Sequence, residues 1–386
     1  MFWKKRTYLD YAAGTTGNPS SPHEEGRRSR ETLEGARTDI ARLLEVQSDD
    51  VIFTSGATEA NALAILGVLK KGDHALYLPS AHASVVENMK LLGKRGVEIN
   101  TLPIKNGRVD CETLKELLRP QTKLVAMDAV CGETGIIWNT REVAQTLATY
   151  ASMPKKESAP AARPIQLSFS GTLAPVLHVD ASQALLTEKI TRAHFGADLL
   201  TLDASKVGGG RGIGALIAHR TIPIVPLYAG GGQERGVRSG SEAPELASKF
   251  AAALAAATCG REKFRASAER AREDLVKTII REIPRVYINE GRNQAPHILN
   301  VSLPGRDTDY LLALLDEEGF AVSTRSACET DSQSGSRAVF ALTGDLNRAK
   351  ATLRISWGPS TRPRELTRFA EKLAAAIVFI DSEGKR

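Results

Sequence analysis

The chain has 386 residues, of which 42% are hydrophobic and 25% are charged, the balance of an ordinary soluble globular protein. The net charge of +6 is modest for this length and no basic tract is interleaved with aromatic residues, so we expect no direct nucleic-acid binding. Because no stretch of about 18 apolar residues is present, a membrane-spanning helix is not expected either.

The N-terminal segment MFWKKRTYLDYAAG has basic residues but no apolar segment after them, so no secretory signal peptide is predicted. The cysteines show neither CxxC pairing nor the spacing of metal ligands, which argues against a disulfide framework or a zinc site; they are Cys111, Cys131, Cys259 and Cys328. Free thiols suit a reducing compartment, and we therefore expect a cytoplasmic protein.

Short apolar segments alternate with helix-like segments between about residues 50 and 220. The first, DVIFTSGATEANALAILGVL, passes from a β-branched stretch through a Ser-Gly turn into a helical pattern. Further strands are predicted at DHALYLP, VEINTLPI, KLVAMDAV, VLHVDAS, DLLTLDA and GALIAH. This alternation predicts an α/β fold with a mainly parallel sheet covered on both faces, whose functional residues gather at the carboxyl ends of the strands.

Two segments depart from the alternation. Residues 151–170, rich in Pro, Ala, Ser and Lys, are predicted to form a surface loop. An Ala-rich pattern from about residue 244 to Leu275 predicts a long helix that joins a large domain to a smaller one. We place the large domain at residues 13–245 and the small domain at residues 1–12 and 246–386.

Asp180 ends the predicted strand VLHVD, and Lys206 follows the next strand, one residue before a run of glycines that starts at Gly208. Either residue alone has an ordinary explanation, Asp180 as a helix cap and Lys206 as a solvated side chain. Together they match pyridoxal phosphate, which needs a lysine amine for its Schiff base and an acid beside its pyridine nitrogen. The glycines after Lys206 would let the chain clear such a cofactor.

The glycine-rich segment GRGIGA, residues 210–215, also fits the G-x-G-x-x-A pattern of a dinucleotide-binding loop. The apolar segment IGALIAH that follows predicts a strand, whereas a dinucleotide loop opens a helix. We therefore favour pyridoxal phosphate over a dinucleotide.

Two other motifs fit the same cofactor. In FTSGATEAN, residues 55–59 open a helix after a strand, where free backbone N–H groups and the helix dipole favour a phosphate dianion, although an ordinary capping box explains the same residues. His82 follows the strand ALYLP. An imidazole there could stack on a pyridine ring and move protons, although a histidine at such a position is more often structural.

As a set, these motifs resemble the NifS/IscS-like cysteine desulfurases, which are fold-type I pyridoxal phosphate enzymes of the class V aminotransferase family. The resemblance extends over nearly the whole chain and rests on YLDYAAGTTGNPSSPHEEGR, IFTSGATEAN, HVDASQ, GGGQERGVRSGSE, RSAC and LRISWG. It implies a mainly parallel, seven-stranded-type sheet in the large domain, a smaller α+β C-terminal domain, and a homodimer.

The resemblance also implies a role for each matching position. Lys206 would carry the Schiff base, Asp180 would pair with the pyridine nitrogen, and His82 would stack on the ring. Gln183 would bond the phenolic oxygen, and Arg354 would clamp the substrate carboxylate with its bidentate guanidinium. The phosphate would be held by Ala57, Thr58, Ser205 and, across the dimer interface, Ser241.

Cys328 matches the catalytic cysteine of the family and lies in a segment rich in Ser, Thr and Gly, STRSACETDSQSGSRAVFALTG, whose length resembles the long-loop group. A buried apolar role is the alternative for any single cysteine. The resemblance implies conversion of L-cysteine to L-alanine with a persulfide left on Cys328. The sulfur would pass to an acceptor protein, such as an iron–sulfur scaffold or a tRNA-thiolation protein.

The sequence departs from the family pattern near the site. Ser205 stands where the family usually has histidine, and Asp203 stands where a serine phosphate ligand often sits. Because a carboxylate repels phosphate, we expect Asp203 to face elsewhere. Cys131-Gly132 replaces an Asn-Asn pair that helps hold the cofactor and substrate, and the stretch after DYAAG is shorter by about a helix.

These departures keep two alternatives open. One is a related pyridoxal phosphate enzyme with another substrate, such as a selenocysteine lyase or a cysteine/cystine lyase. The other is a catalytically impaired scaffold with the same fold.

Overall fold

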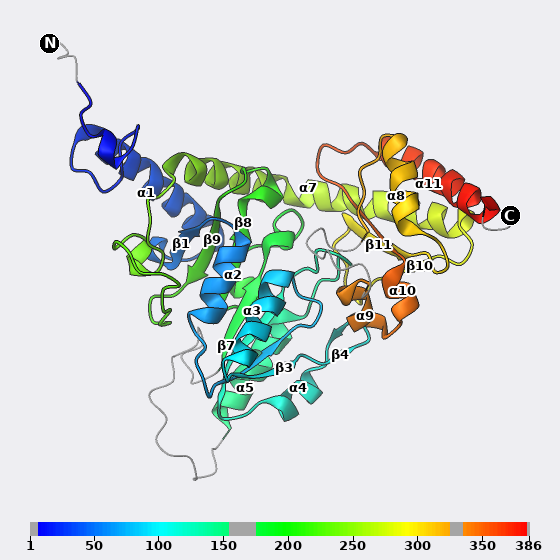
Figure 1. Cartoon of the computed structure of the whole chain (residues 1–386), viewed down its shortest axis with the longest axis horizontal. Helices are drawn as coiled ribbons and strands as arrows, with labels where there is room; N and C mark the ends of the chain where they lie inside the picture. The colour runs from blue at the N-terminus through cyan, green and yellow to red at the C-terminus, as the bar shows by residue number, and fades with distance from the viewer. Residues whose placement is uncertain (1–6, 154–174, 325–334, 384–386) are drawn as a thin grey trace.

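The structure is a computed structural model that describes residues 7–153, 175–324 and 335–383. A region built around a large sheet and a smaller region lie side by side, and the long helix α7 (Pro244–Glu282) runs along both of them (Figure 1). Each region has its own hydrophobic core. The predicted long helix is confirmed, and it extends beyond Leu275.

The large region contains a seven-stranded sheet in the order β1-β9-β8-β7-β6-β2-β3. The strands are β1 (Val51–Thr54), β2 (His74–Tyr77), β3 (Glu98–Thr101), β6 (Thr122–Asp128), β7 (Val176–Asp180), β8 (Leu199–Asp203) and β9 (Gly214–Ala218). All neighbouring pairs from β3 to β8 are parallel, and β9 runs antiparallel to both of its neighbours. The prediction of a mainly parallel sheet is confirmed.

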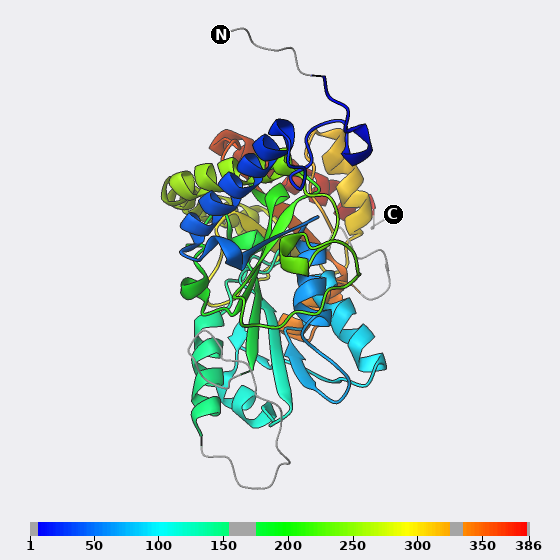
Figure 2. The ribbon, with the colours of Figure 1, turned by 90° about the vertical axis from the view of Figure 1, so that its left-hand side faces the viewer.

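Helices cover both faces of this sheet, as its apolar strands require. In Figure 2, α2 (Ala57–Leu66) and α3 (Ala83–Lys94) lie on one side and α5 (Thr140–Ser152) lies on the other. The remaining helices of this region are α1 (Glu24–Leu44), α4 (Cys111–Leu117) and α6 (Arg192–Phe195). A short hairpin of β4 (Ile104–Lys105) and β5 (Arg108–Val109) lies beside them.

The smaller region is an antiparallel sheet of β10 (Tyr287–Ile288), β11 (Ile298–Ser302) and β12 (Thr352–Ser356). Its helices are α8 (Thr308–Glu317), α9 (Arg337–Thr343), α10 (Leu346–Lys350) and α11 (Pro363–Glu383). Leu299 and Leu353 from the sheet and Leu373 from α11 are fully buried in one core with the end of α7. The helices and the antiparallel sheet together match the predicted α+β character.

The glycines at residues 208–212 lead into strand β9, which pairs with β8, so the expected strand is confirmed and no helix opens there. No described helix has both the length and the apolar character that crossing a bilayer requires. The predicted loop at 151–170 lies almost entirely outside the described residues, because 154–174 are not described.

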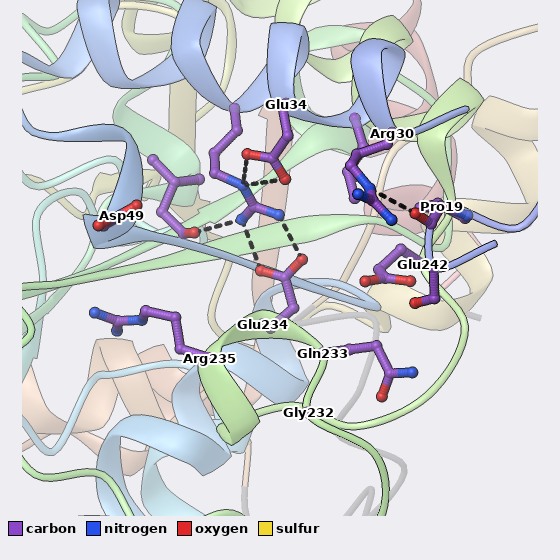
Figure 3. A pocket seen from close by; sticks show the side chains of 13 residues that line it. Pro19, Arg30, Glu34, Asp49, Gly232, Gln233, Glu234, Arg235 and Glu242 are labelled. Carbon is purple, nitrogen blue, oxygen red and sulfur yellow. Dashed lines mark hydrogen bonds and ion pairs between the residues drawn. The ribbon is translucent and has the colours of Figure 1, made fainter. Parts of the chain in front are cut away.

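A buried ion pair joins α1, β1 and the loop before α7. The Arg37 guanidinium donates two hydrogen bonds of 2.8 Å to the Glu234 carboxylate and one of 2.7 Å to the carbonyl oxygen of Val51. The backbone N–H of Phe53 donates to the same carboxylate at 2.8 Å. Figure 3 shows the two bonds that the guanidinium donates to the Glu234 carboxylate, beside a cavity of about 440 Å³.

The surroundings strengthen this pair. Hydrogen bonding and attraction to Glu234 raise the pKa of Arg37 despite its burial. The side chain of Glu234 is only 1% exposed, so removing it leaves a buried cation without its main partner. The ion pair therefore fixes the start of the segment 234–242 relative to the sheet.

We predict that Glu234→Ala lowers the free energy of unfolding by about 3–5 kcal/mol, because it removes the buried partner of Arg37 and leaves that cation only the exposed carboxylate of Glu34. Urea denaturation measures the change. The matched control is Glu34→Ala, since Glu34 contacts the same guanidinium but its side chain is 53% exposed. The control should cost at most about 1 kcal/mol, and equal losses in the two variants would contradict the account.

Candidate active site

A cavity of about 660 Å³ lies where β6, β7 and β8 end, between the two regions of the molecule. These three parallel strands end in Asp128, Asp180 and Asp203, and all three aspartates line the cavity. Most of the predicted site residues line it too: Ala57, Thr58, His82, Asp180, Gln183, Ser205, Lys206 and Arg354. Residues from distant parts of the chain therefore meet at the sheet edge that the sequence predicted.

Asp180 is 7% exposed and its carboxylate accepts two hydrogen bonds. Asn61, on α2, donates its side-chain amide to Oδ2 at 2.8 Å, and the backbone N–H of Ser182 donates to Oδ1 at 3.0 Å. These two donors hold the Asp180 carboxylate in a fixed orientation at the cavity wall.

The same asparagine also reaches His82 through Ser84. Asn61 donates to the Ser84 hydroxyl at 2.8 Å, and Ser84 contacts Nδ1 of His82 through its hydroxyl at 2.8 Å and its backbone N–H at 3.2 Å. Because a backbone N–H can only donate, Nδ1 is an acceptor, and the neutral ring carries its proton on Nε2. One hydrogen-bond network therefore orients both Asp180 and His82.

Lys206 lies in the short 3-10 helix η4 (Ala204–Val207) directly after β8. Its side chain lines the cavity, and we find no hydrogen bond or ion pair of its amine with any residue of the described segments. Gly208 follows with a φ of 78°, the left-handed conformation that turns the chain away from the cavity. The amine is thus available to a carbonyl compound in the cavity.

Gly132, in the Cys131-Gly132 pair that stands where the family has Asn-Asn, lies beside Gln183. A Cβ atom on residue 132 would lie 2.9 Å from Nε2 of Gln183, so glycine leaves room for the Gln183 side chain. The Gly132 carbonyl oxygen also accepts from Nη1 of Arg354 at 3.3 Å. Burial raises the pKa of the Cys131 thiol to about 11, which keeps it neutral.

Arg354 reaches the cavity from β12 in the smaller region. Its backbone bonds Ser323 in both directions, with N–O distances of 2.7 and 3.3 Å, while β12 pairs with β11 on its other side. The guanidinium is therefore carried on a rigid strand and is half-buried at the cavity wall.

Asp203 does not face away from the cavity, and that expectation is wrong. Its Oδ2 accepts from the backbone N–H of Ala57 at 3.2 Å, and its Oδ1 accepts from the N–H of Ser205 at 2.8 Å. The first turn of α2 presents unpaired N–H groups beside the end of β8, and these donors attract the carboxylate.

Two predicted residues are not placed at the cavity. Ser241 is exposed and does not line it, so its contact with a second subunit stays a prediction. Cys328 lies outside the described residues, so its role also stays a prediction.

Sequence reasoning missed Asp128, Arg337 and the network through Asn61 and Ser84. Burial and the nearby charge of Asp180 raise the pKa of Asp128 well above its usual value, and Arg337 opposes this only in part. The segment KLVAMDAV carries an aspartate at the end of a strand, the same signal that identified Asp180. The network had no comparable signal, because it depends on how α2 packs against α3.

Known proteins with a similar sequence cover nearly the whole chain. A family model described as aminotransferase class-V matches residues 6–153 and 173–369. Cysteine desulfurase IscS 1 of Archaeoglobus fulgidus is 31% identical over 96% of this chain and 92% of its own length. Cysteine desulfurase IscS of Dictyoglomus turgidum is 32% identical over 94% of this chain and 92% of its own.

Solved structures of NifS-like proteins have a similar fold over more than nine-tenths of this chain. A NifS-like protein superposes with a TM-score of 0.82 at 26% identity, covering 94% of this chain and 92% of that one. A NifS-like protein from Rickettsia africae superposes with a TM-score of 0.78 at 26% identity, with coverage of 93% and 91%. The overall fold of this chain is therefore a known one.

We predict that Asp128→Asn raises the free energy of unfolding more at pH 8 than at pH 5. The pKa of Asp128 is raised in the folded state, so its proton stabilises the fold at low pH and that contribution is lost as the pH rises through the folded pKa. Urea denaturation at both pH values measures the effect.

The control for this prediction is Asp110→Asn. The pKa of Asp110 is lowered by its bond to Thr113, so neutralising this side chain should give no gain at pH 8. A gain for Asp128→Asn that is the same at both pH values, or no gain at all, would contradict the assignment.

Proposed function

Because the chain belongs to the class-V aminotransferase family, we propose that it is a pyridoxal phosphate-dependent cysteine desulfurase, as its IscS relatives are named. It would convert L-cysteine to L-alanine and retain the sulfur for transfer. The observation that carries the proposal is that the amine of Lys206, which has no partner among the described residues, and the buried carboxylate of Asp180 line one cavity.

The residues around these two groups fit the aromatic end of pyridoxal phosphate. A carboxylate held by two donors, like Asp180, suits a protonated pyridine nitrogen, and a free amine like Lys206 suits the Schiff base. When bound, the cofactor supplies an electron sink for carbanion chemistry at the substrate Cα. The surrounding residues therefore have to orient the cofactor and the substrate for this chemistry.

His82 and Gln183 would act on the ring from the cavity wall. Since Nδ1 of His82 accepts from the backbone of Ser84, Nε2 is the atom that can hold or move a proton. The network through Asn61 and Ser84 fixes the orientation of this imidazole, which would stack on the ring. Gln183, which occupies the space that Gly132 leaves open, would donate to the phenolic oxygen.

Arg354 would bind the substrate carboxylate with its planar guanidinium, which gives both affinity and orientation. The phosphate would lie at the start of α2 and η4, near the backbone of Ala57 and the hydroxyls of Thr58 and Ser205. Ser241 would approach it from the second subunit of a homodimer, and its exposure outside the cavity supports that arrangement.

Cys328 would act as the nucleophile. Its thiolate would attack the sulfur of cysteine, so that an S–S bond forms as the Cβ–S bond breaks and the electron pair stays with the carbon, which takes up a proton. The sulfur would leave as a persulfide for an acceptor protein, an iron–sulfur scaffold or a tRNA-thiolation protein. The absence of paired cysteine motifs supports a reducing, cytoplasmic location.

A catalytically impaired scaffold is the second candidate. Asp203 at the start of α2 favours it, because a carboxylate opposes phosphate binding there. The two candidates differ in whether the protein turns over cysteine once the cofactor is loaded.

We predict that Lys206→Ala lowers kcat/KM for L-cysteine by about a thousandfold or more, because no other lysine among the described residues lines the cavity. Alanine and sulfide released in the presence of a reductant are the readout. Lys189→Ala is the control, since Lys189 pairs with Glu45 on the surface and should be dispensable.

Wild-type protein that carries the cofactor and releases no alanine would support the scaffold. Selenocysteine assayed in parallel separates the desulfurase from a selenocysteine lyase: a lyase would turn over selenocysteine alone. Full turnover by Lys206→Ala would overturn the proposal.

We predict that Arg354→Gln raises KM for cysteine about tenfold or more, with a smaller effect on kcat, because a neutral amide cannot form the charged bidentate contact. Steady-state kinetics measure both parameters. Arg362→Gln is the control, because Arg362 is 62% exposed and pairs only weakly with Glu365. An unchanged KM in Arg354→Gln would show that Arg354 does not bind the substrate carboxylate.

A further inference from the structure

The Asp203 carboxylate accepts hydrogen bonds from backbone N–H groups at the end of the cavity where the phosphate of the cofactor would lie. Its carboxylate accepts from the N–H of Ala57 in the first turn of α2 and from the N–H of Ser205 in η4. The side chain thus bridges the two elements between which a phosphate would bind.

The start of α2 is a site for an anion. The helix is 10 residues long, and its N-cap, Gly56, has no side chain to accept from the first N–H groups. Carboxylates take that place, Glu59 at the N–H of Ser55 and Asp203 at the N–H of Ala57. Two backbone donors at this end of the helix, the N–H groups of Ser55 and Ala57, are therefore already used by carboxylates of the chain itself.

The two carboxylates differ in their counter-ions. Glu59 is paired with the guanidinium of Arg238 at 3.1 Å and accepts from the hydroxyl of Tyr228 at 2.5 Å. For Asp203, we find no cation paired with it within the part of the chain that the structure describes. Its charge is therefore not neutralised where the phosphate would approach.

We propose that Asp203 is an internal competitor of the cofactor's phosphate group. In the cofactor-free chain it caps α2 and fixes the turn that carries Lys206. A phosphate dianion that enters must either displace this carboxylate from Ala57 or lie beside it against charge repulsion. The proposal rests on the proposed function and makes Asp203 a determinant of cofactor affinity.

The test is a binding titration of cofactor-free protein. Wild type, Asp203→Asn and Asp203→Ser are stripped with hydroxylamine and dialysed, and each is titrated with pyridoxal phosphate and with pyridoxal, which lacks the phosphate. Asparagine keeps the shape and an acceptor oxygen but removes the charge. Intrinsic tryptophan fluorescence follows binding, and the melting temperature of the cofactor-free protein is measured in parallel.

Both Asp203 variants should bind pyridoxal phosphate about tenfold or more tightly than wild type, because one repulsive charge beside a dianion is removed. Their affinity for pyridoxal should stay within about twofold, and their cofactor-free melting temperature should fall, because a charged cap of α2 is lost. A merely structural residue would weaken the fold without strengthening cofactor binding.

The control is Asp307→Asn. Asp307 caps α8 by accepting from two backbone N–H groups at 3.0 Å, and it does not line the cavity. This variant should leave the affinity for pyridoxal phosphate unchanged.

Equal or weaker binding of pyridoxal phosphate by the two Asp203 variants would overturn the inference and leave the proposed function intact. Tighter binding of pyridoxal to the same degree would also overturn it, since the effect would not involve the phosphate. If no protein, wild type included, binds either compound, the proposed function itself fails. If Asp203→Asn does not fold, the titration is done with Asp203→Ser alone, because the smaller serine side chain also removes the charge.

Discussion

The parallel arrangement of β6, β7 and β8 brings three aspartates to one edge of the sheet, and the cavity depends on how their charges are accommodated. Each is stabilised in a different way. Asp180 accepts hydrogen bonds from Asn61 and Ser182, burial raises the pKa of Asp128, and Asp203 accepts from backbone N–H groups of α2 and η4. Burying a carboxylate without hydrogen-bond partners costs free energy, so the partners of these three aspartates determine whether the cavity can hold them.

Helix α2 links the two ends of the site. Its first turn meets Asp203, whereas Asn61, one turn later, holds Asp180 and reaches His82 through Ser84. A shift of this helix would therefore disturb the aromatic end and the phosphate end together. The buried ion pair of Arg37 and Glu234 fixes the position of the segment that leads to Ser241. It does so because both charged groups are held together where water is excluded.

Much of this arrangement could be predicted from the sequence. The alternation of apolar and amphipathic segments predicted the sheet, and parallel strands necessarily bring residues such as Asp180 and Lys206 to one edge. The orientation of Asp203 could not be predicted, because it depends on which donors a neighbouring helix presents. The same holds for Gly132, whose importance lies in the space it leaves for Gln183.

The central claim is that Lys206 and Asp180 hold opposite parts of one pyridine ring in the cavity between the two regions. A crystal structure of the protein grown with pyridoxal phosphate tests this most directly. The account predicts electron density continuous with the Lys206 amine and a ring nitrogen within hydrogen-bond distance of the Asp180 carboxylate. Cofactor density elsewhere, or a ring nitrogen facing away from Asp180, would contradict it.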